Sequence, residues 1–278
     1  GFDIGSGIFV LNSDNVTVGG AAEEDGNTVS NIDWDGIKFA GGTGHLIQNN
    51  SVDEVTRVGI YLGGVNSTSV LDNLVTNPHL GGYGAISADF GSSLTISNND
   101  IYNNFAGSGI RLYQVAGTNV IDSNDMDSFG QNGIEAYGST NVTASNNDIR
   151  NAANDGIHFE TVSNANITGN KVFQINGNGI YGYNLYLDGG ADATAQTVIQ
   201  NNNVYMTGLD GIHLDGIANA YVVENEVHDL SGAGIFANNS YATVSHTDSI
   251  FDPITEESFD VFTPAGQSIY SGNTVYQV

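Results

Sequence analysis

A repeat of about 23 residues runs along the whole chain and restricts its fold more than any other feature of the sequence. In the three copies within residues 141–215, an Asn lies two residues before an apolar residue, as at Asn147 and Ile149, and a Gly-Ile pair begins nine residues after that Asn. The steps between copies are 23 to 32 residues. The Asn position recurs at Asn27, Asn50, Asn73, Asn99, Asn124, Asn147, Asn170, Asn202, Asn225, Asp248 and Asn273.

A second marker, the isoleucine of the Gly-Ile pair, keeps the same period. It recurs at Ile8, Ile37, Ile60, Ile86, Ile110, Ile134, Ile157, Ile180, Ile212 and Ile235, with Phe259 in the last copy. Two independent markers with one period predict a solenoid of stacked units. We therefore expect one elongated domain over residues 1–278, with about eleven coils. Since the repeat is in phase near both ends, we also expect a segment of a longer protein or end-to-end stacking with neighbouring domains or copies.

Two runs in each copy alternate apolar and polar residues, which is the pattern of a β-strand with one buried face. One run follows the Gly, as in residues 157–160, and the other leads into the Asn, as in residues 94–96. No window has the apolar stripe of a helix. A leucine-rich repeat is the main alternative, because residues 94–101 fit its pattern, but the β-branched and aromatic residues after the Gly favour an all-β parallel solenoid.

The regular Asn position resembles the asparagine ladder of right-handed parallel β-helix repeat proteins, such as pectate lyases and mannuronan epimerases. This resemblance covers nearly all 278 residues and has one departure, Asp248. It implies a right-handed, single-stranded parallel β-helix and carbohydrate-related activity, although a fold does not by itself determine function. Residues 156–160 read Gly-Ile-His-Phe-Glu, whereas mannuronan epimerases carry Tyr-Gly-Phe-Asp-Pro-His on this strand, with the acid and His in opposite positions.

The chain is strongly acidic, with 31 Asp and Glu against five Lys and Arg and a formal net charge of −26. We therefore expect no nucleic-acid partner and no membrane insertion, and we expect partners that are neutral, cationic or bridged by metal ions. The metal ligands are unknown, and calcium is a candidate cofactor. An acidic, lysine-poor chain without Cys resembles proteins exported by bacterial type I systems, or proteins from salty habitats. The first of these favours an extracellular or cell-surface location.

The residue after each inward Ile should point outward, as should the residue two positions further, and stacked coils about 4.8 Å apart align these residues in two rows. The first row is predicted to hold Phe9, Lys38, Tyr61, Ser87, Arg111, Glu135, His158, Tyr181, His213, Phe236 and Asp260. The second row is predicted to hold Leu11, Ala40, Gly63, Asp89, Tyr113, Tyr137, Glu160, Tyr183, Asp215, Asn238 and Phe262. An insertion within residues 184–197 would wall one side of this face.

Five adjacent coils of this face carry the candidate site. The predicted catalytic residues are His158, Tyr181 and His213, because His titrates near neutral pH and a neighbouring carboxylate can retune it. We expect Glu160 beside His158 and Asp215 beside His213, an arrangement that suits proton abstraction next to a sugar carboxylate. The predicted substrate-binding residues are Arg111, Tyr113, Glu135, Tyr137, Glu160, Tyr183 and Asp215.

Arg111 is the cation of this cluster that is expected to neutralise a sugar carboxylate, since Lys38, Arg57, Arg150 and Lys171 are expected elsewhere. A hydrolase would instead use two carboxylates on either side of the scissile bond, and Glu160 with Glu135 or with Asp215 could supply them. Two functions therefore fit the sequence: an extracellular polysaccharide-active lyase, epimerase or hydrolase, or a non-catalytic adhesin, surface-layer or filament-forming β-helix. The residue cluster favours the first, and the scarcity of cations favours the second.

Overall fold

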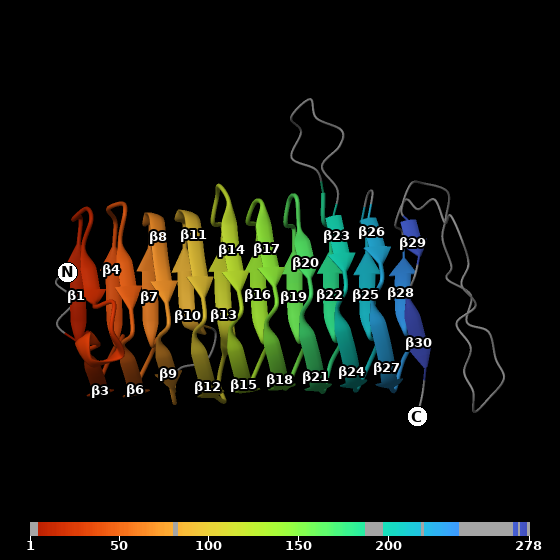
Figure 1. Cartoon of the computed structure of the whole chain (residues 1–278), viewed down its shortest axis with the longest axis horizontal. Coiled ribbons are helices and arrows are strands. Elements are labelled where there is room, and N and C mark those ends of the chain that lie inside the picture. Colours follow the sequence, from red (N-terminus) through yellow and green to blue (C-terminus); the bar gives the residue numbers. More distant parts are fainter. Residues whose placement is uncertain are drawn as a thin grey trace.

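The computed structural model is a stack of short parallel strands in three sheets that run the length of the molecule (Figure 1). The structure describes residues 5–79, 83–186, 197–217, 220–238, 269–271 and 273–276. Each sheet has ten strands in the described residues, and successive strands of the chain enter sheets A, B and C in turn. A short 3-10 turn, η1 (Glu23–Asp25), is inserted before β3.

The strands of each sheet follow one another at every third position of the chain order. Sheet A consists of β1 (Ile8–Leu11), β4 (Ile37–Ala40), β7 (Ile60–Gly63), β10 (Gly84–Asp89), β13 (Ser108–Tyr113), β16 (Ile134–Tyr137), β19 (Ile157–Glu160), β22 (Ile180–Tyr183), β25 (Ile212–Asp215) and β28 (Ile235–Asn238). Sheet B consists of β2 (Thr17–Gly19), β5 (Leu46–Gln48), β8 (Asn66–Leu71), β11 (Ser92–Ser97), β14 (Asn119–Asp122), β17 (Val142–Ser145), β20 (Asn166–Thr168), β23 (Thr197–Gln200), β26 (Ala220–Val223) and β29 (Ile269–Ser271). Sheet C consists of β3 (Thr28–Ile32), β6 (Ser51–Val55), β9 (Leu74–Thr76), β12 (Asp100–Asn104), β15 (Asp125–Phe129), β18 (Asp148–Ala152), β21 (Lys171–Ile175), β24 (Asn203–Thr207), β27 (Glu226–Leu230) and β30 (Thr274–Tyr276).

Residues with positive φ mark the corners between the sheets. In the middle of the stack these are Gly138 after sheet A, Asn146 after sheet B and Asn151 near the end of the sheet C strand. Asn and Gly adopt this conformation more readily than other residues, which explains why they are common at these corners. Alternation predicts two strands in each coil, and the structure adds a third, in sheet C, directly after the Asn position.

The Ile of each Gly-Ile pair points into the core, as predicted. Ile157, Ile180 and Ile212 pair in register in adjacent strands and are fully buried. The preceding Gly is required by close packing, because a Cβ on Gly156 would overlap Val172 and lie 2.6 Å from the Gly179 carbonyl oxygen. This contact explains why the Gly-Ile pair repeats with the coil.

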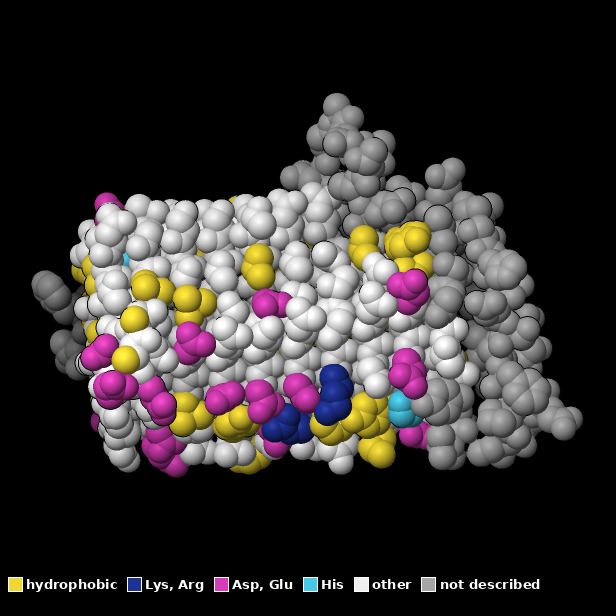
Figure 2. Space-filling model, viewed as in Figure 1, with side chains coloured by type: hydrophobic (Ala, Val, Ile, Leu, Met, Phe, Trp, Pro, Cys, Tyr) yellow, Lys and Arg dark blue, Asp and Glu magenta, His cyan; other side chains and the backbone are white. Residues whose placement is uncertain are grey.

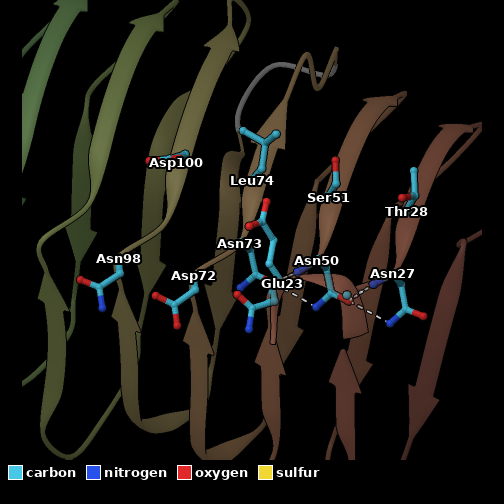
Figure 3. Close-up of a pocket in the computed structure, with 12 residues that line it drawn as sticks. Glu23, Asn27, Thr28, Asn50, Ser51, Asp72, Asn73, Leu74, Asn98 and Asp100 are labelled. Atoms are coloured by element: carbon cyan, nitrogen blue, oxygen red, sulfur yellow. Dashed lines mark hydrogen bonds between the residues drawn. The ribbon is translucent and has the colours of Figure 1, made fainter. Parts of the chain in front are cut away.

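The Asn ladder lies at the corner between sheets B and C (Figure 3). Asn27 Nδ2 donates to Asn50 Oδ1 at 2.9 Å, and Asn50 Nδ2 donates to Asn73 Oδ1 at 3.0 Å. Each buried Asn also donates to a backbone carbonyl, as Asn50 does to Val18. The predicted ladder is confirmed from Asn27 to Asn225.

The last step of the ladder corrects the sequence prediction. Asn225 Nδ2 donates directly to Asn273 Oδ1 at 2.8 Å, and β27 pairs with β30, so the ladder passes from Asn225 to Asn273 in one step. The prediction of about eleven coils is therefore replaced by ten strands in each sheet of the described chain. The predicted positions of Asp248, Phe259, Asp260 and Phe262 fall outside the described residues.

Candidate functional site

The outer face of sheet A brings the ten predicted site residues together in two rows. In the first row, His158 pairs with Glu135 on one side and Tyr181 on the other, and Tyr181 pairs with His213. The second row runs in the same register from the end of β13 to the end of β25. The ten residues are Arg111, Tyr113, Glu135, Tyr137, His158, Glu160, Tyr181, Tyr183, His213 and Asp215.

His158 is held by Asp155, which lies outside the two predicted rows. Its Nδ1 is 2.8 Å from Asp155 Oδ2, and its Nε2 is 3.8 Å from Glu160 Oε2. Burial lowers the pKa of His158, but the hydrogen bond to Asp155 and the charges of three nearby carboxylates outweigh it, so the pKa is raised. Because a carboxylate only accepts hydrogen bonds, Nδ1 carries a proton and Nε2 is left for proton exchange.

His213 repeats this arrangement on the other side of Tyr181. Its Nδ1 is 2.7 Å from Asp210 Oδ2. The closest carboxylate to each imidazole is therefore the Asp three residues before it, and not the predicted Glu160 or Asp215. The sequence signal for these pairs is Asp-Gly-Ile-His, which occurs at residues 155–158 and again at residues 210–213.

A second, shorter ladder fixes both aspartates at the corner before sheet A. Asp155 Oδ1 accepts hydrogen bonds from the backbone N and the Nδ2 of Asn178, at 2.7 and 3.0 Å. Asn178 Oδ1 accepts from the backbone N of Asp210 at 3.1 Å, and Asp210 Oδ1 accepts from the backbone N of Ala233 at 2.7 Å. One carboxylate oxygen of each Asp thus binds the next coil while the other binds a His, so the scaffold itself positions the imidazoles.

Tyr181 lies between the two imidazoles in the first row. Its ring centroid is 4.8 Å from that of His158 and 5.3 Å from that of His213. Burial raises the pKa of its hydroxyl, and the charges of nearby carboxylates raise it further. Asp215 contributes most among these carboxylates. The hydroxyl therefore stays protonated at neutral pH, and it can donate a hydrogen bond to a ligand.

Arg111 lies in the first row as predicted, but its charge is already engaged by the protein. Its Nη1 is 2.9 Å from Asp89 Oδ1 and its Nε is 3.7 Å from Glu135 Oε1. Its guanidinium also lies over the Tyr113 ring, 4.8 Å from the centroid. The expectation that Arg111 neutralises a sugar carboxylate is therefore weakened, because such a ligand would compete with two carboxylates of the protein.

Exposed aromatic side chains of the described residues concentrate at sheet A. Each of them lies in a sheet A strand or within three residues of one: Trp34, Phe90, Phe105, Tyr137, Tyr183, Tyr186 and Phe236. Arg57, which was expected to lie away from the cluster, contacts the Tyr83 ring at 4.8 Å, and Arg111 contacts the same ring at 5.8 Å. The aromatic and charged face therefore extends beyond the predicted five coils towards β4 and β7.

Sheet C carries a separate charged stripe, visible along the lower part of Figure 2. Arg150 pairs with Asp125, Asp127 and Asp148, and Lys171 pairs with Asp148 at 3.0 Å. The stripe continues into the stacked rings of Phe173, Tyr205 and His228. These charges compensate one another within the sheet, which is typical of a structural role.

Among the hollows of the described surface, two adjoin features described above. One, of about 420 Å³, adjoins His158 and is lined by Asp155, Asn178 and Leu209, among others. The other, of about 440 Å³, follows the ladder corner and includes Glu23, among others (Figure 3). The first lies beside the Asp–His pair and gives a ligand room to reach it, whereas the second is lined largely by the ladder corner.

The described residues contain no group of three or more His, Asp or Glu side chains placed to hold a metal ion. Nor does that part of the chain include a helix with the length and hydropathy of a membrane span. The predicted insertion within residues 184–197 lies mostly outside the described residues, which resume at Thr197.

The three sheets, the Asn ladder and the parallel register define a parallel β-helix. The outer face of one sheet, sheet A, carries the candidate site residues. A family model for the right-handed β-helix region matches residues 6–124 and 107–186, and the chain belongs to this family. The right-handed parallel β-helix predicted from the sequence is thereby confirmed.

Several solved structures share this fold at low sequence identity. The Dettilon tailspike protein gp208 is 16% identical with a TM-score of 0.60, and the match covers 98% of this chain and 60% of that chain. The A-module of the Azotobacter vinelandii mannuronan C-5 epimerase AlgE4 is 12% identical with a TM-score of 0.58, covering 99% and 87%. A mutant of the periplasmic alginate epimerase AlgG is 15% identical with a TM-score of 0.52, covering 92% and 72%. No curated protein matches the sequence.

Proposed function

We propose that the outer face of sheet A binds a polysaccharide and that its two Asp–His pairs provide acid–base groups for a reaction on that ligand. The observation that carries this proposal is the duplicated geometry: Asp155–His158 and Asp210–His213 flank Tyr181 in three adjacent coils. A face that is merely solvated does not need an Asp fixed by the ladder beneath each imidazole.

The shape and composition of the face support a linear carbohydrate ligand. The five coils from β13 to β25 extend over about 20 Å, since neighbouring strands are about 4.8 Å apart. Aromatic rings present apolar surface with a polar rim, and those of Tyr137 and Tyr183 are exposed in the second row. The names of two proteins with the same fold, a mannuronan epimerase and an alginate epimerase, point to the same ligand class. An extracellular location is part of this proposal.

The proton chemistry follows from the protonation states. A neutral imidazole whose Nδ1 donates to Asp155 has a lone pair on Nε2 and can accept a proton from a bound sugar or water. Tyr181 stays protonated between the two imidazoles and can donate one. A base and an acid thus lie in adjacent coils on the same face.

Binding is tested with a panel of immobilised polysaccharides. Replacing Tyr137 or Tyr183 by Ala should weaken binding by about threefold to tenfold, because an aromatic contact contributes roughly 0.5–1.5 kcal/mol. Tyr221→Ala is the matched control, since Tyr221 is a half-buried outward residue of β26 in sheet B. Failure of the protein to bind any polysaccharide, or equal losses in all three variants, would contradict the proposal.

Catalysis is tested on the polysaccharides that bind, by assays for unsaturated products, reducing ends and altered epimer content. Where a product forms, His158→Ala and Tyr181→Phe should lower turnover by about two to four orders of magnitude, the range for loss of a general acid or base. Binding without any product would refute the catalytic part and leave the non-catalytic β-helix that the sequence also allows.

A further inference from the structure

The charge of the proposed glycan-binding face is unbalanced. Between β10 and β25, the described outer face of sheet A and the corner before it carry one guanidinium, that of Arg111. The carboxylates over the same span are Asp89, Glu135, Asp155, Glu160, Asp210 and Asp215. The other Lys and Arg of residues 84–217 lie on sheet C, where aspartates neutralise them.

The one Lys or Arg side chain of this span is not available to an anionic ligand. Arg111 is 16% exposed and is engaged by Asp89, Glu135 and the Tyr113 ring. A sugar carboxylate that approached it would have to displace a protein carboxylate, and the displaced group would then lose its cation on an already acidic face. A polyuronate is therefore a poor fit at neutral pH.

The second row has the features that a positively charged sugar substituent requires. Tyr137, Glu160, Tyr183 and Asp215 alternate ring and carboxylate in adjacent coils. A carboxylate attracts an ammonium group, and a neighbouring ring face adds a cation–π contribution. Glu160 and Asp215 stand two coils apart, about 10 Å, so two separate ammonium groups of one chain can be bound.

We propose that the glycan bound by this face carries free amino groups, as polymers of amino sugars do, and is not a polyuronate. This inference rests on the proposed function and narrows its ligand class. It also has a chemical consequence, because β-elimination and C5 epimerisation both begin at the proton beside a sugar carboxylate. An amino-sugar ligand without carboxylates excludes both reactions on this face.

The test compares three sets of oligosaccharides of equal length by isothermal titration: glucosamine oligomers with free amines, the same oligomers fully N-acetylated, and uronate oligomers. Below the pKa of the amines, the free-amine oligomers should bind about tenfold more tightly than the acetylated ones, and uronates should bind least. The preference should shrink in high salt. If acetylated or uronate oligomers bind equally well or better, the inference is overturned while the proposed function stands. If none of these oligomers binds, the inference is overturned, and the polysaccharide panel decides whether the proposed function stands.

Two double variants that change the net charge equally test which part of the molecule causes the preference for free amines. Glu160→Gln with Asp215→Asn should remove most of the advantage of the free amines, measured as the ratio of the affinities for free-amine and acetylated oligomers in the same variant. Glu24→Gln with Asp25→Asn changes the net charge equally at the exposed η1 turn and should leave the advantage intact. Equal effects in the two double variants would assign the preference to the net charge of −26 and overturn its assignment to this face.

Discussion

At the scale of single residues, Asp155 links the scaffold to the chemistry of the face. One of its carboxylate oxygens accepts two hydrogen bonds from Asn178 in the next coil, and the other holds His158. Substitution by Asn would keep an acceptor for Asn178 but turn an NH₂ group towards His158 Nδ1. The imidazole would then lose its hydrogen bond and a nearby negative charge.

Asp155→Asn should therefore lower the pKa of His158, because burial, the largest influence, lowers it, and the hydrogen bond and charge of Asp155, the two largest influences that raise it, would be lost. The measurement is a pH titration of the ring resonances of His158 by NMR. His213 has its own aspartate, Asp210, and serves as the internal control, since the substitution leaves that hydrogen bond in place. An unchanged His158 titration would show that Asp155 does not set its protonation.

The same substitution should affect stability in a pH-dependent way. The pKa of His158 is raised in the folded state, so the pair stabilises the fold fully below the unfolded pKa of about 6.5 and loses this effect as pH rises through the folded pKa. The melting temperature of Asp155→Asn should fall further below wild type at about pH 5 than at about pH 8. Equal losses at both values would indicate a purely structural defect.

The sequence predicts the two rows of the site but not the partners of their charged residues. Period-two alternation gives the direction of His158 and His213 because both lie inside strands. It gives no direction for Asp155, which lies in the turn before β19. Alternation also does not predict that Arg111 pairs with Asp89. Asp89 lies in the preceding coil and in the second row, whereas Arg111 lies in the first row.

At the scale of elements, the Asn ladder holds the corner between sheets B and C. Asn170 Oδ1 accepts from the backbone N and the Nδ2 of Asn147, and its Nδ2 donates to Ala144 O and Asn202 Oδ1. Since these groups are buried, removing the Asn170 side chain leaves donors and an acceptor without partners.

Asn170→Ala should destabilise the fold by about 1–3 kcal/mol, the usual effect of buried groups left unpaired. Denaturant unfolding measures this change. Asn154→Ala is the control at an exposed Asn and should stay within about 0.5 kcal/mol. If Asn170→Ala is no worse than the control, the ladder does not stabilise the stack.

The sheet C stripe is a second element-scale feature that can be tested. Burial raises the pKa of Asp127, but side-chain hydrogen bonds from Asn151 and Ser128, together with the charge of Arg150, outweigh this and leave it lowered. Arg150→Gln should therefore destabilise the protein by about 1 kcal/mol at neutral pH, because three aspartates lose their cation. A group with a lowered pKa loses its stabilising effect as pH falls, so the difference should shrink in acid. Urea unfolding at neutral and acidic pH would detect this, and a pH-independent loss would contradict it.

Most of the fold could be predicted from the sequence because the markers of each coil are steric requirements. Gly is needed where a Cβ would overlap the next coil, and Asn is needed where the ladder turns. The prediction fails at Asp248, which lies two residues before Ile250 and so imitates the Asn position. Only the pairing of β27 with β30 and the hydrogen bond between Asn225 and Asn273 show that the ladder continues directly from Asn225 to Asn273.

At the scale of the whole molecule, repulsion between like charges is the main unfavourable contribution to the stability of the folded state. A net charge of −26 on 278 residues makes the folded state repel itself, and salt or divalent cations should relieve this by screening or binding. We expect the melting temperature to rise from low to molar salt, and to rise with calcium at constant ionic strength if a specific site exists. A melting temperature that is insensitive to both would contradict the electrostatic account.

The direct step from Asn225 to Asn273 also bears on how such a molecule can change during evolution. The ladder hydrogen bond there is as short as elsewhere, although 48 residues separate its partners along the chain. The sequence between them includes the connection from β28 in sheet A to β29 in sheet B. The long step between β22 and β23 is likewise a connection from sheet A to sheet B. The entropy of closing a connection grows only with the logarithm of its length, about 0.6 kcal/mol for each doubling. New segments can therefore be acquired beside the sheet A face without altering the register of the scaffold, which lets ligand preference diverge while the fold is conserved.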